Sequence, residues 1–219
     1  METKKQDEYK IEIINNIYDE KFEQLKTLIE AFSIEVFLRQ KFGSKRKHDY
    51  QLTEEEISFL KKDIEERIKF AENSIFFKHT PINTRYYALI HNGKVVAFQT
   101  AQIRNIWEQL EGWRNFAYTS KEYMGKTGTV IDTHQDVCHG FLSNIIYEDI
   151  TKWFQENGIT KEKTATGKNM YKNILAYIVY KGFIPEKEDS KRVYLVRDSN
   201  DLKDKKELKK IYIKYISEH

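Results

Sequence analysis

The hydrophobic positions of the chain recur with two different periods. Spacing of three and four residues places apolar side chains on one face of a helix, whereas alternation or a short apolar run is typical of a strand. The first period predicts helices whose buried faces begin with Phe22, Ile57, Leu142, Tyr171 and Leu208. The second period predicts strands over Tyr9–Ile17, Arg85–Ile90, Lys94–Ile103, Thr127–Thr133, Thr160–Thr166 and Arg192–Arg197.

Short polar signals mark the ends of these elements. Asp19 is placed to cap the first helix, and Thr53-Glu54-Glu55-Glu56 has the spacing of a capping box at the start of the second. Asn92-Gly93 favours the positive backbone dihedral angles of a tight hairpin turn between two strands. Asn157-Gly158 and Gly182 are typical of helix ends, because glycine adopts the left-handed conformation without strain.

The segment Asn105–Lys126 is rich in aromatic residues but lacks a clear period. We expect an irregular loop or a short strand here. Its aromatic side chains either line a substrate cleft, as loops on a rigid scaffold often do, or pack into the core.

The order of these elements predicts the fold class. A strand, two helices, a hairpin and then strands alternating with helices indicate an α/β protein with a mixed central sheet flanked by helices. We expect one domain over residues 1–198 and a C-terminal helical appendix over residues 199–219. This extra helix serves either as a packed appendix or as the contact of a homodimer.

Composition and charge narrow the classes of protein. The chain is 40% hydrophobic and 32% charged, which is enough apolar material for a core. A formal net charge of +3 and a short basic cluster, Lys45-Arg46-Lys47, do not favour a nucleic-acid-binding protein. No apolar run approaches membrane-spanning length, and the polar start lacks the apolar core of a signal peptide. The single cysteine excludes an intrachain disulfide, so we expect a cytoplasmic protein without a membrane partner.

The most informative segment is Gln135-Asp136-Val137-Cys138-His139-Gly140, which we expect to lead from the strand Thr127–Thr133 into a helix. A helix start presents unpaired amides and the positive end of the helix dipole, and small residues there let a phosphate approach the backbone. A metal site is not expected, because His134 and His139 lack standard zinc spacing. Cys138 at a helix start is also a candidate nucleophile.

On these residues the chain resembles the GNAT superfamily of acetyl-CoA-dependent N-acyltransferases. Gln135, Cys138 and Gly140 occupy the positions of its cofactor motif, with Cys138 in the place of the first glycine, and the surrounding elements follow the family's order. The resemblance implies that acetyl-CoA or another acyl-CoA is bound by Val130, Ile131, Gln135, Asp136, Val137, Cys138, His139, Gly140 and Asn173. Lys161, Lys163, Lys168 and Lys172 either attract its phosphates or form a solvated face.

The resemblance also implies direct transfer of the acyl group to an amine of a small molecule or a protein. The candidate general bases are Asp132, His134, Glu122 and His139, of which we favour Asp132. Ile178 occupies the position of the tyrosine that protonates the departing thiolate, so Tyr177 or Tyr180 takes that role only if the helix register differs, and we favour Tyr180. Two alternatives stay open, a catalytically silent GNAT-like binding module and a nucleic-acid-binding protein.

Overall fold

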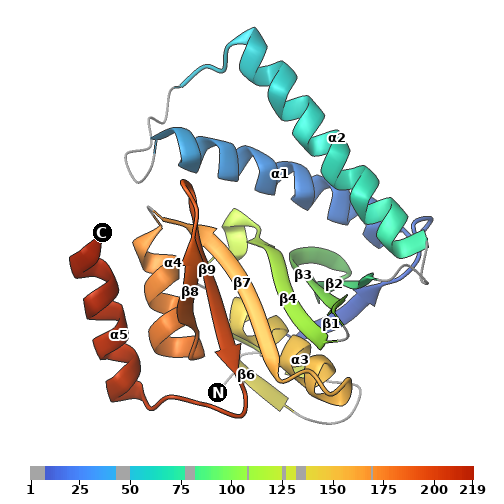
Figure 1. The fold of residues 1–219 in the computed structure, drawn as a ribbon. Helices are drawn as coiled ribbons and strands as arrows, with labels where there is room; N and C mark the ends of the chain where they lie inside the picture. Colours follow the sequence, from blue (N-terminus) through green and yellow to red (C-terminus); the bar gives the residue numbers. More distant parts are fainter. Residues whose placement is uncertain are drawn as a thin grey trace, which may run out of the picture. The chain divides into compact units, whose positions relative to one another are not determined.

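The computed structural model describes residues 8–42, 50–76, 82–107, 109–124, 127–131, 137–168 and 170–219, and gives the backbone path alone at 127–131 and 137–145. The chain divides into two compact units. Unit 1 consists of Met1–Gln102 and Phe116–Trp153, and unit 2 of Ile103–Asn115 and Phe154–His219. Figure 1 shows the elements in chain order, from blue to red.

Within the described residues, unit 1 holds three helices and six strands, and it shares two of these strands with unit 2. Its helices are α1 (Glu20–Phe42), α2 (Glu54–Phe76) and α3 (Leu142–Glu156) as far as Trp153. Its strands are β1 (Glu8–Ile14), β2 (Ile82–His91), the first part of β3 (Lys94–Ile106), the last part of β4 (Gln109–Thr119), β5 (Thr127–Ile131) and β6 (Val137–Phe141). They lie in the order β6-β5-β1-β2-β3-β4, with β1 antiparallel to β2 and parallel to β5.

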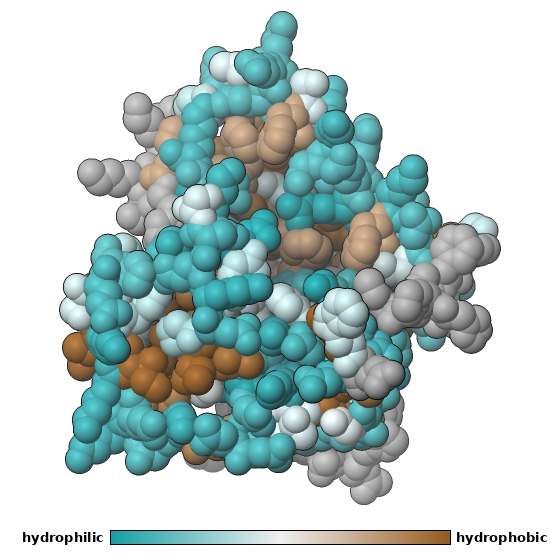
Figure 2. Space-filling model, viewed as in Figure 1, coloured by the Kyte–Doolittle hydropathy of each residue, from teal (hydrophilic) through white to brown (hydrophobic). Residues whose placement is uncertain are grey.

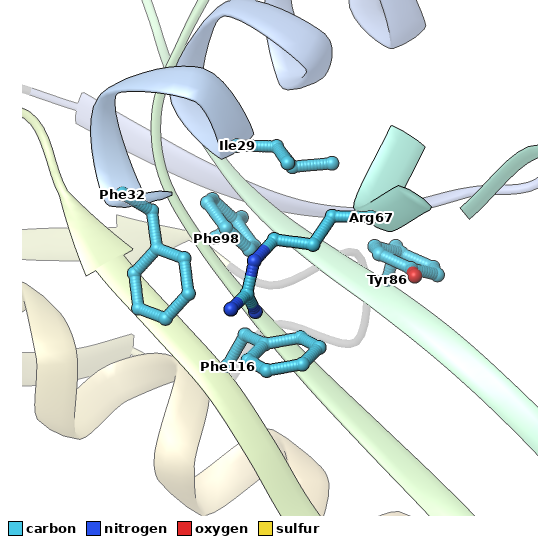
Figure 3. Close-up of a pocket in the computed structure, with 6 residues that line it drawn as sticks. All are labelled: Ile29, Phe32, Arg67, Tyr86, Phe98 and Phe116. Atoms are coloured by element: carbon cyan, nitrogen blue, oxygen red, sulfur yellow. The ribbon is translucent and has the colours of Figure 1, made fainter. Parts of the chain in front are cut away.

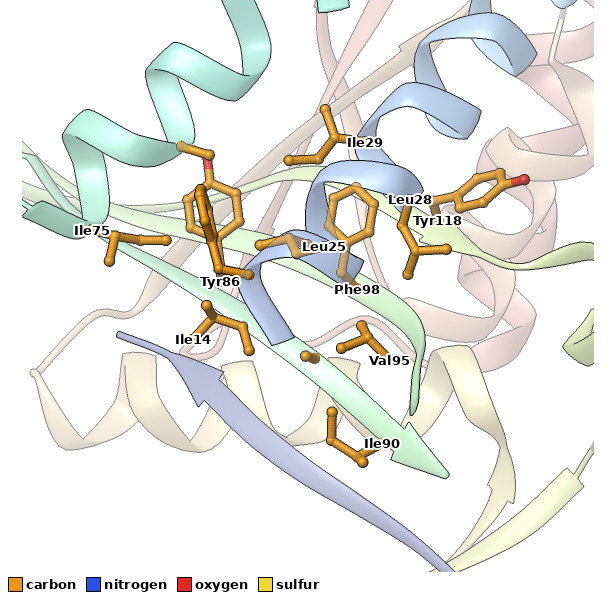
Figure 4. Packing of buried hydrophobic residues seen from close by; sticks show 13 residues of the cluster. Ile14, Leu25, Leu28, Ile29, Ile75, Tyr86, Ile90, Val95, Phe98 and Tyr118 are labelled. Atoms are coloured by element: carbon orange, nitrogen blue, oxygen red, sulfur yellow. The ribbon is translucent and has the colours of Figure 1, made fainter. Parts of the chain in front are cut away.

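Both faces of strand β2 are covered in unit 1. Tyr86, Ala88 and Ile90 pack into a cluster with the buried side chains of α1 and α2, which Figure 4 shows at close range. On the opposite face, the Tyr87 ring lies 6.2 Å from that of Trp153 in α3. Successive side chains of a strand point to opposite faces. Because both faces of β2 are covered, every side chain from Tyr86 to Ile90 is buried.

The polar residues at the ends of the helices and strands form the predicted caps and turn. The Thr53 hydroxyl accepts a hydrogen bond from the Glu56 amide at 3.3 Å, and the Glu56 carboxylate accepts one from the Thr53 amide at 2.9 Å. The Asp19 carboxylate accepts a backbone amide of the first turn of α1 at 2.9 Å. Asn92 and Gly93 have φ angles of 49° and 76°, and they join β2 to β3 as a hairpin.

Unit 2 contains the other end of the β3–β4 hairpin and everything after Trp153. Its elements are β7 (Lys161–Gly167), α4 (Tyr171–Leu175), the π-helical segment η2 (Ala176–Tyr180), β8 (Ile184–Glu188), β9 (Arg192–Asp198) and α5 (Lys205–Glu218). The strands lie in the order β4-β7-β9-β8. Gly158 and Gly182 have φ angles of 70° and 77°, as predicted for the ends of α3 and of η2.

The prediction for the aromatic segment Asn105–Lys126 is wrong in its main part. The structure forms an 11-residue strand, β4, where an irregular loop or a short strand is expected, and a single 3-10 turn, η1 (Lys121–Tyr123), follows it. The buried positions in the first half of β4 hold Gly112 and Arg114, and neither is hydrophobic. The alternation of the strand is therefore real but invisible as an apolar pattern.

The predicted helix start is also wrong for the residues of Gln135–Gly140 that the structure describes, Val137–Gly140. Residues Val137, Cys138, His139 and Gly140 lie in strand β6, and α3 begins at Leu142. Strand β6 pairs antiparallel with β5, with Gly140 opposite Gly128. A segment that starts with a β-branched residue and ends with an aromatic one favours a strand, and here its glycine pairs within a ladder. The amides of the α3 start therefore begin at Leu142.

The C-terminal helix is present as predicted. In α5, Leu208 and Tyr215 are buried, and the helix packs against η2 within unit 2. Ile213 is 67% exposed, and Figure 2 shows hydrophobic side chains gathered at the lower left, where Figure 1 draws α4 and α5. The division into residues 1–198 and 199–219, and the homodimer, stay predictions.

We predict that Thr53→Ala lowers the free energy of unfolding by about 1 kcal/mol, because the Glu56 amide loses its side-chain acceptor. Urea denaturation followed by circular dichroism measures this change. Thr53→Ser keeps the hydroxyl and should stay close to the parent. Equal losses in the two variants would contradict a role for the cap.

Candidate functional site

Strands β4 and β7 of unit 2 pair in parallel. Their ladder joins Gly112–Arg114 to Glu162–Thr164, three residues on each strand. On its other side, β7 pairs with β9 from Lys161 through Gly167. The described strands of unit 2 therefore leave the last residues of β7 without a ladder partner on the β4 side. Such an edge offers main-chain donors and acceptors to an extended ligand.

A buried ion pair lies across the parallel strands. The Arg114 Nε donates to Glu162 Oε2 at 2.8 Å, and Arg114 Nη2 lies 2.7 Å from the same oxygen. Both side chains are almost completely buried, at 0% and 4% exposure. The guanidinium of Arg197 lies 3.9 Å from the other carboxylate oxygen, Oε1. Two charges in the interior are tolerated when they are paired and hydrogen-bonded, as they are here.

Close packing surrounds this ion pair. The Arg114 guanidinium lies 5.3 Å from the centre of the Phe154 ring, a cation–π contact. The same ring covers Gly112, where a Cβ atom would meet it at 2.8 Å. Glycine is therefore required at this position of β4 by the close approach of Phe154.

Trp113 points the other way from Arg114 and is held by charged side chains. The Arg104 guanidinium lies 4.6 Å and the Lys163 ammonium 6.0 Å from the centre of its ring, and its indole nitrogen donates to Glu111 at 3.2 Å. Burial lowers the pKa of Lys163, but ion pairs with Glu111 at 3.0 Å and Glu186 at 3.2 Å outweigh it and raise that pKa. Lys163 is thus held by two carboxylates, which compete with any phosphate for it.

Two residues predicted from the resemblance lie just after β7. Asn173 is half-buried in α4, and its side-chain amide faces the Met170 sulfur at 4.0 Å. The Lys168 ammonium pairs with Glu188 at 2.5 Å. The structure brings both residues to the chain segment that follows β7, and their roles toward a cofactor stay predictions.

The segment η2 is π-helical, and the role of Tyr180 stays a prediction. Ile178 is fully buried, whereas Tyr180 is 67% exposed at the end of the segment. A π-helical turn adds a residue relative to an α-helix and so rotates the side chains that follow it. The Lys205 ammonium lies 5.8 Å from the centre of the Tyr180 ring.

The other predicted cofactor residues lie in two places. Val130 and Ile131 belong to β5, where Val130 is opposite Tyr9 of β1. The cofactor candidates Gln135 and Asp136 lie outside the described residues, as do the candidate bases Asp132 and His134. The remaining members, Val137 to Gly140, follow in β6.

A group of aromatic side chains beside β5 is missed by the sequence analysis. The rings of Tyr9 and His91 are stacked at 4.6 Å, and the His91 Nδ1 lies 2.9 Å from the Tyr123 hydroxyl. Tyr9 and His91 are opposite each other in the β1–β2 ladder. Since these residues lie far apart along the chain, only the strand pairing brings the group together.

Unit 1 holds a pocket lined by Ile29, Phe32, Arg67, Tyr86, Phe98 and Phe116. Figure 3 shows the Arg67 guanidinium between the rings of Phe32 and Phe116, whose centres lie 5.4 Å and 4.7 Å away. Asp63 accepts two hydrogen bonds from Arg67, at 2.7 Å and 3.0 Å. Burial raises the pKa of Tyr86, so its hydroxyl stays protonated. The pocket is aromatic, with a paired guanidinium within it.

The described part of the chain holds no group of three or more His, Cys, Asp or Glu side chains that could bind a metal ion. None of its helices is long and apolar enough to cross a membrane.

Solved structures share the fold of this chain. PaiA N-acetyltransferase from Thermoplasma acidophilum, in complex with coenzyme A, matches 86% of this chain and 98% of its own at a TM-score of 0.56 and 17% identity. A chain of the NatC complex bound to Gag peptide and CoA matches 87% of this chain and 98% of its own, at a TM-score of 0.52 and 13% identity. An acetyltransferase from Thermus thermophilus matches 86% of this chain and 97% of its own, at a TM-score of 0.53 and 11% identity. The chain therefore has the GNAT acetyltransferase fold, and the predicted fold class is confirmed.

Sequence comparison adds nothing to this likeness. No protein-family model matches the chain, and no curated protein matches it. The identities to the solved structures lie well below the range in which function is shared, so the likeness is one of fold.

We predict that Gly112→Ala lowers the free energy of unfolding by about 1–3 kcal/mol, because the added methyl group overlaps the Phe154 ring. Thermal and urea denaturation measure the loss. The double variant Gly112→Ala with Phe154→Leu should recover part of it, since leucine leaves room for the methyl group. Strictly additive effects of the two substitutions would contradict the contact.

Proposed function

We propose that this chain is an acyl-CoA-dependent N-acyltransferase. It would move an acyl group, most simply acetyl, from acyl-CoA to an amine of a small molecule or a protein. The observation that carries the proposal is the parallel β4–β7 pair, with its three-residue ladder, in a chain of GNAT fold. PaiA and the NatC complex, which share the fold, hold coenzyme A, and the NatC complex also holds a peptide.

The chemistry of coenzyme A fits the β7 edge. Its pantetheine arm is extended and carries two amide groups, so it can pair with a strand as a peptide does. The β4–β7 ladder ends at Thr164, whereas β7 runs on to Gly167. The main-chain groups over this stretch would hold the arm and fix the position of the thioester.

The transfer itself needs two proton movements. The amine nitrogen attacks the thioester carbon, the carbon–nitrogen bond forms, and the carbon–sulfur bond breaks. A base takes the proton that the amine loses, and an acid returns a proton to the departing thiolate. We propose Asp132 as the base and Tyr180 as the acid.

The case for Tyr180 rests on the π-helical register of η2. Ile178 stands where the resemblance expects the acid, and it is fully buried without a proton to give. Tyr180 is the exposed phenol at the end of the same segment.

The alternative is a catalytically silent binding module with the same fold. Two observations favour it, the apolar Ile178 in the place of the acid and the strand conformation of the segment Val137–Gly140. Such a module would bind acyl-CoA or another ligand without turnover. Binding and activity must therefore be measured separately.

We predict that acetyl-CoA and CoA raise the melting temperature of the protein, because a ligand that binds the folded state alone stabilises it. At a concentration about 100 times Kd the stabilisation is about 2.7 kcal/mol. Differential scanning fluorimetry measures the shift, with adenosine 3′,5′-bisphosphate as the control ligand that keeps nucleotide phosphates and lacks the pantetheine arm. An unchanged melting temperature at millimolar acetyl-CoA would refute the cofactor proposal.

We predict that Asp132→Asn and Tyr180→Phe each lower kcat about 100-fold, the usual contribution of one acid or base. A thiol-release assay with a panel of amines measures the rate. Tyr18→Phe, at a tyrosine that is 85% exposed in unit 1, is the matched control and should leave it unchanged. Activity of Tyr180→Phe equal to that of the parent would remove Tyr180 from the mechanism.

A further inference from the structure

The Arg114–Glu162 ion pair stands apart from the other ion pairs between described residues. Its two side chains are 0% and 4% exposed, whereas each of the others leaves at least one partner 16% exposed or more. Strands β4 and β7 each contribute one member. The pair therefore links the two parallel strands through the interior of unit 2.

Stability alone is a poor explanation for this pair. Removing two charges from water is costly, and well-packed apolar residues of similar volume often give equal or greater stability. The Phe154 ring beside Arg114 shows that the surroundings are suited to apolar side chains. A buried ion pair at this place is therefore better explained by structural specificity than by stability. The best attested example of such specificity is the selection of one register between paired elements.

The geometry shows which arrangement the pair selects. In the ladder, Gly112 is opposite Glu162 and Arg114 is opposite Thr164, so the Arg114 side chain reaches diagonally across the strands. A slip of one residue would turn one of the two charged side chains to the other face of the sheet and break the 2.7 Å contact between them. Losing this buried, charge-assisted contact costs free energy, and that cost opposes every such slip.

The ladder itself has little means to fix its register. It extends over three residues of each strand, and Gly112 offers no side chain for packing. Thr164, opposite Arg114, is small and polar. A ladder this short leaves the register to side chains. Two ion pairs between described residues cross it, Lys163–Glu111 with 17% and 15% exposure and Arg114–Glu162 with 0% and 4%, and the second is the buried one.

We infer that Arg114 and Glu162 are positioning residues, which fix the register of the β4–β7 pair and thereby the β7 edge proposed for acyl-CoA. The second part of this inference rests on the proposed function. The first part concerns the protein without any ligand. Neither side chain is accessible to a substrate, so both act through the strands that carry them.

The test uses the full chain with two variants. The double variant Arg114→Met with Glu162→Leu replaces the pair by apolar side chains of similar size and is expected to stay folded. Glu162→Gln keeps the shape and removes the negative charge that Arg114 contacts. Glu35→Gln is the matched control, because it neutralises another buried carboxylate paired with arginine, here Arg39 at 2.6 Å in α1.

The first measurement is hydrogen exchange of the amides at Gly112–Arg114 and Glu162–Thr164. In the double variant these amides should exchange at least about tenfold faster, while the melting temperature stays within a few degrees of the parent. The β7–β9 ladder and the control variant should keep the parent rates. Unchanged exchange in the folded double variant would overturn the inference that the pair fixes the register.

The second measurement separates the two proposals. The double variant should raise Kd for CoA, by calorimetry, and KM for acetyl-CoA about tenfold, with KM for the amine unchanged, because the β7 edge alone is altered. A parent protein that binds no CoA would refute the proposed function and leave the exchange result to decide the register. A parent that binds CoA and a double variant that binds equally well would refute the link from the register to the ligand edge.

Discussion

Strands β2 and β3 of unit 1 are buried on both faces, and the arrangement of that unit depends on this constraint. A strand covered on one face needs one layer of helices, whereas one covered on both faces needs two. Helices α1 and α2 form the first layer, and α3 supplies the second through Trp153. Burial also forces polar groups to find partners, as when the Thr100 hydroxyl accepts the Phe116 amide at 3.1 Å.

Unit 2 buries charged and polar side chains in addition to hydrophobic ones. Beside its apolar core, it buries Arg114 and Glu162 together with Thr164 and Thr166. Such a set is costly to remove from water, and it leaves few alternative pairings. Selection of one strand register by side chains has its largest effect in a parallel pair with a short ladder. In the β4–β7 pair the backbone alone contributes few hydrogen bonds.

The sequence predicts most elements of the fold, because local signals specify them. The capping box at Thr53 and the turn at Asn92-Gly93 need no distant partner, and both are confirmed. The candidate site is harder to predict, since long-range pairing builds it. Strand β4 shows no apolar alternation because its inward positions hold Gly112 and Arg114. Likewise β6 forms because β5 pairs with it.

The misplaced segment Val137–Gly140 shows why the fold is a firmer basis for function than a short motif. A motif of small residues indicates a close approach of the backbone, and a helix start and a glycine-to-glycine strand pair both provide one. Phosphate binding uses several adjacent unpaired amides, which a helix start provides. In the antiparallel β5–β6 ladder, alternate amides of β6 bond to β5 instead. If acyl-CoA binds as proposed, its phosphates would find such a cluster of unpaired amides at a helix start, and the described helix that follows this segment, α3, begins at Leu142.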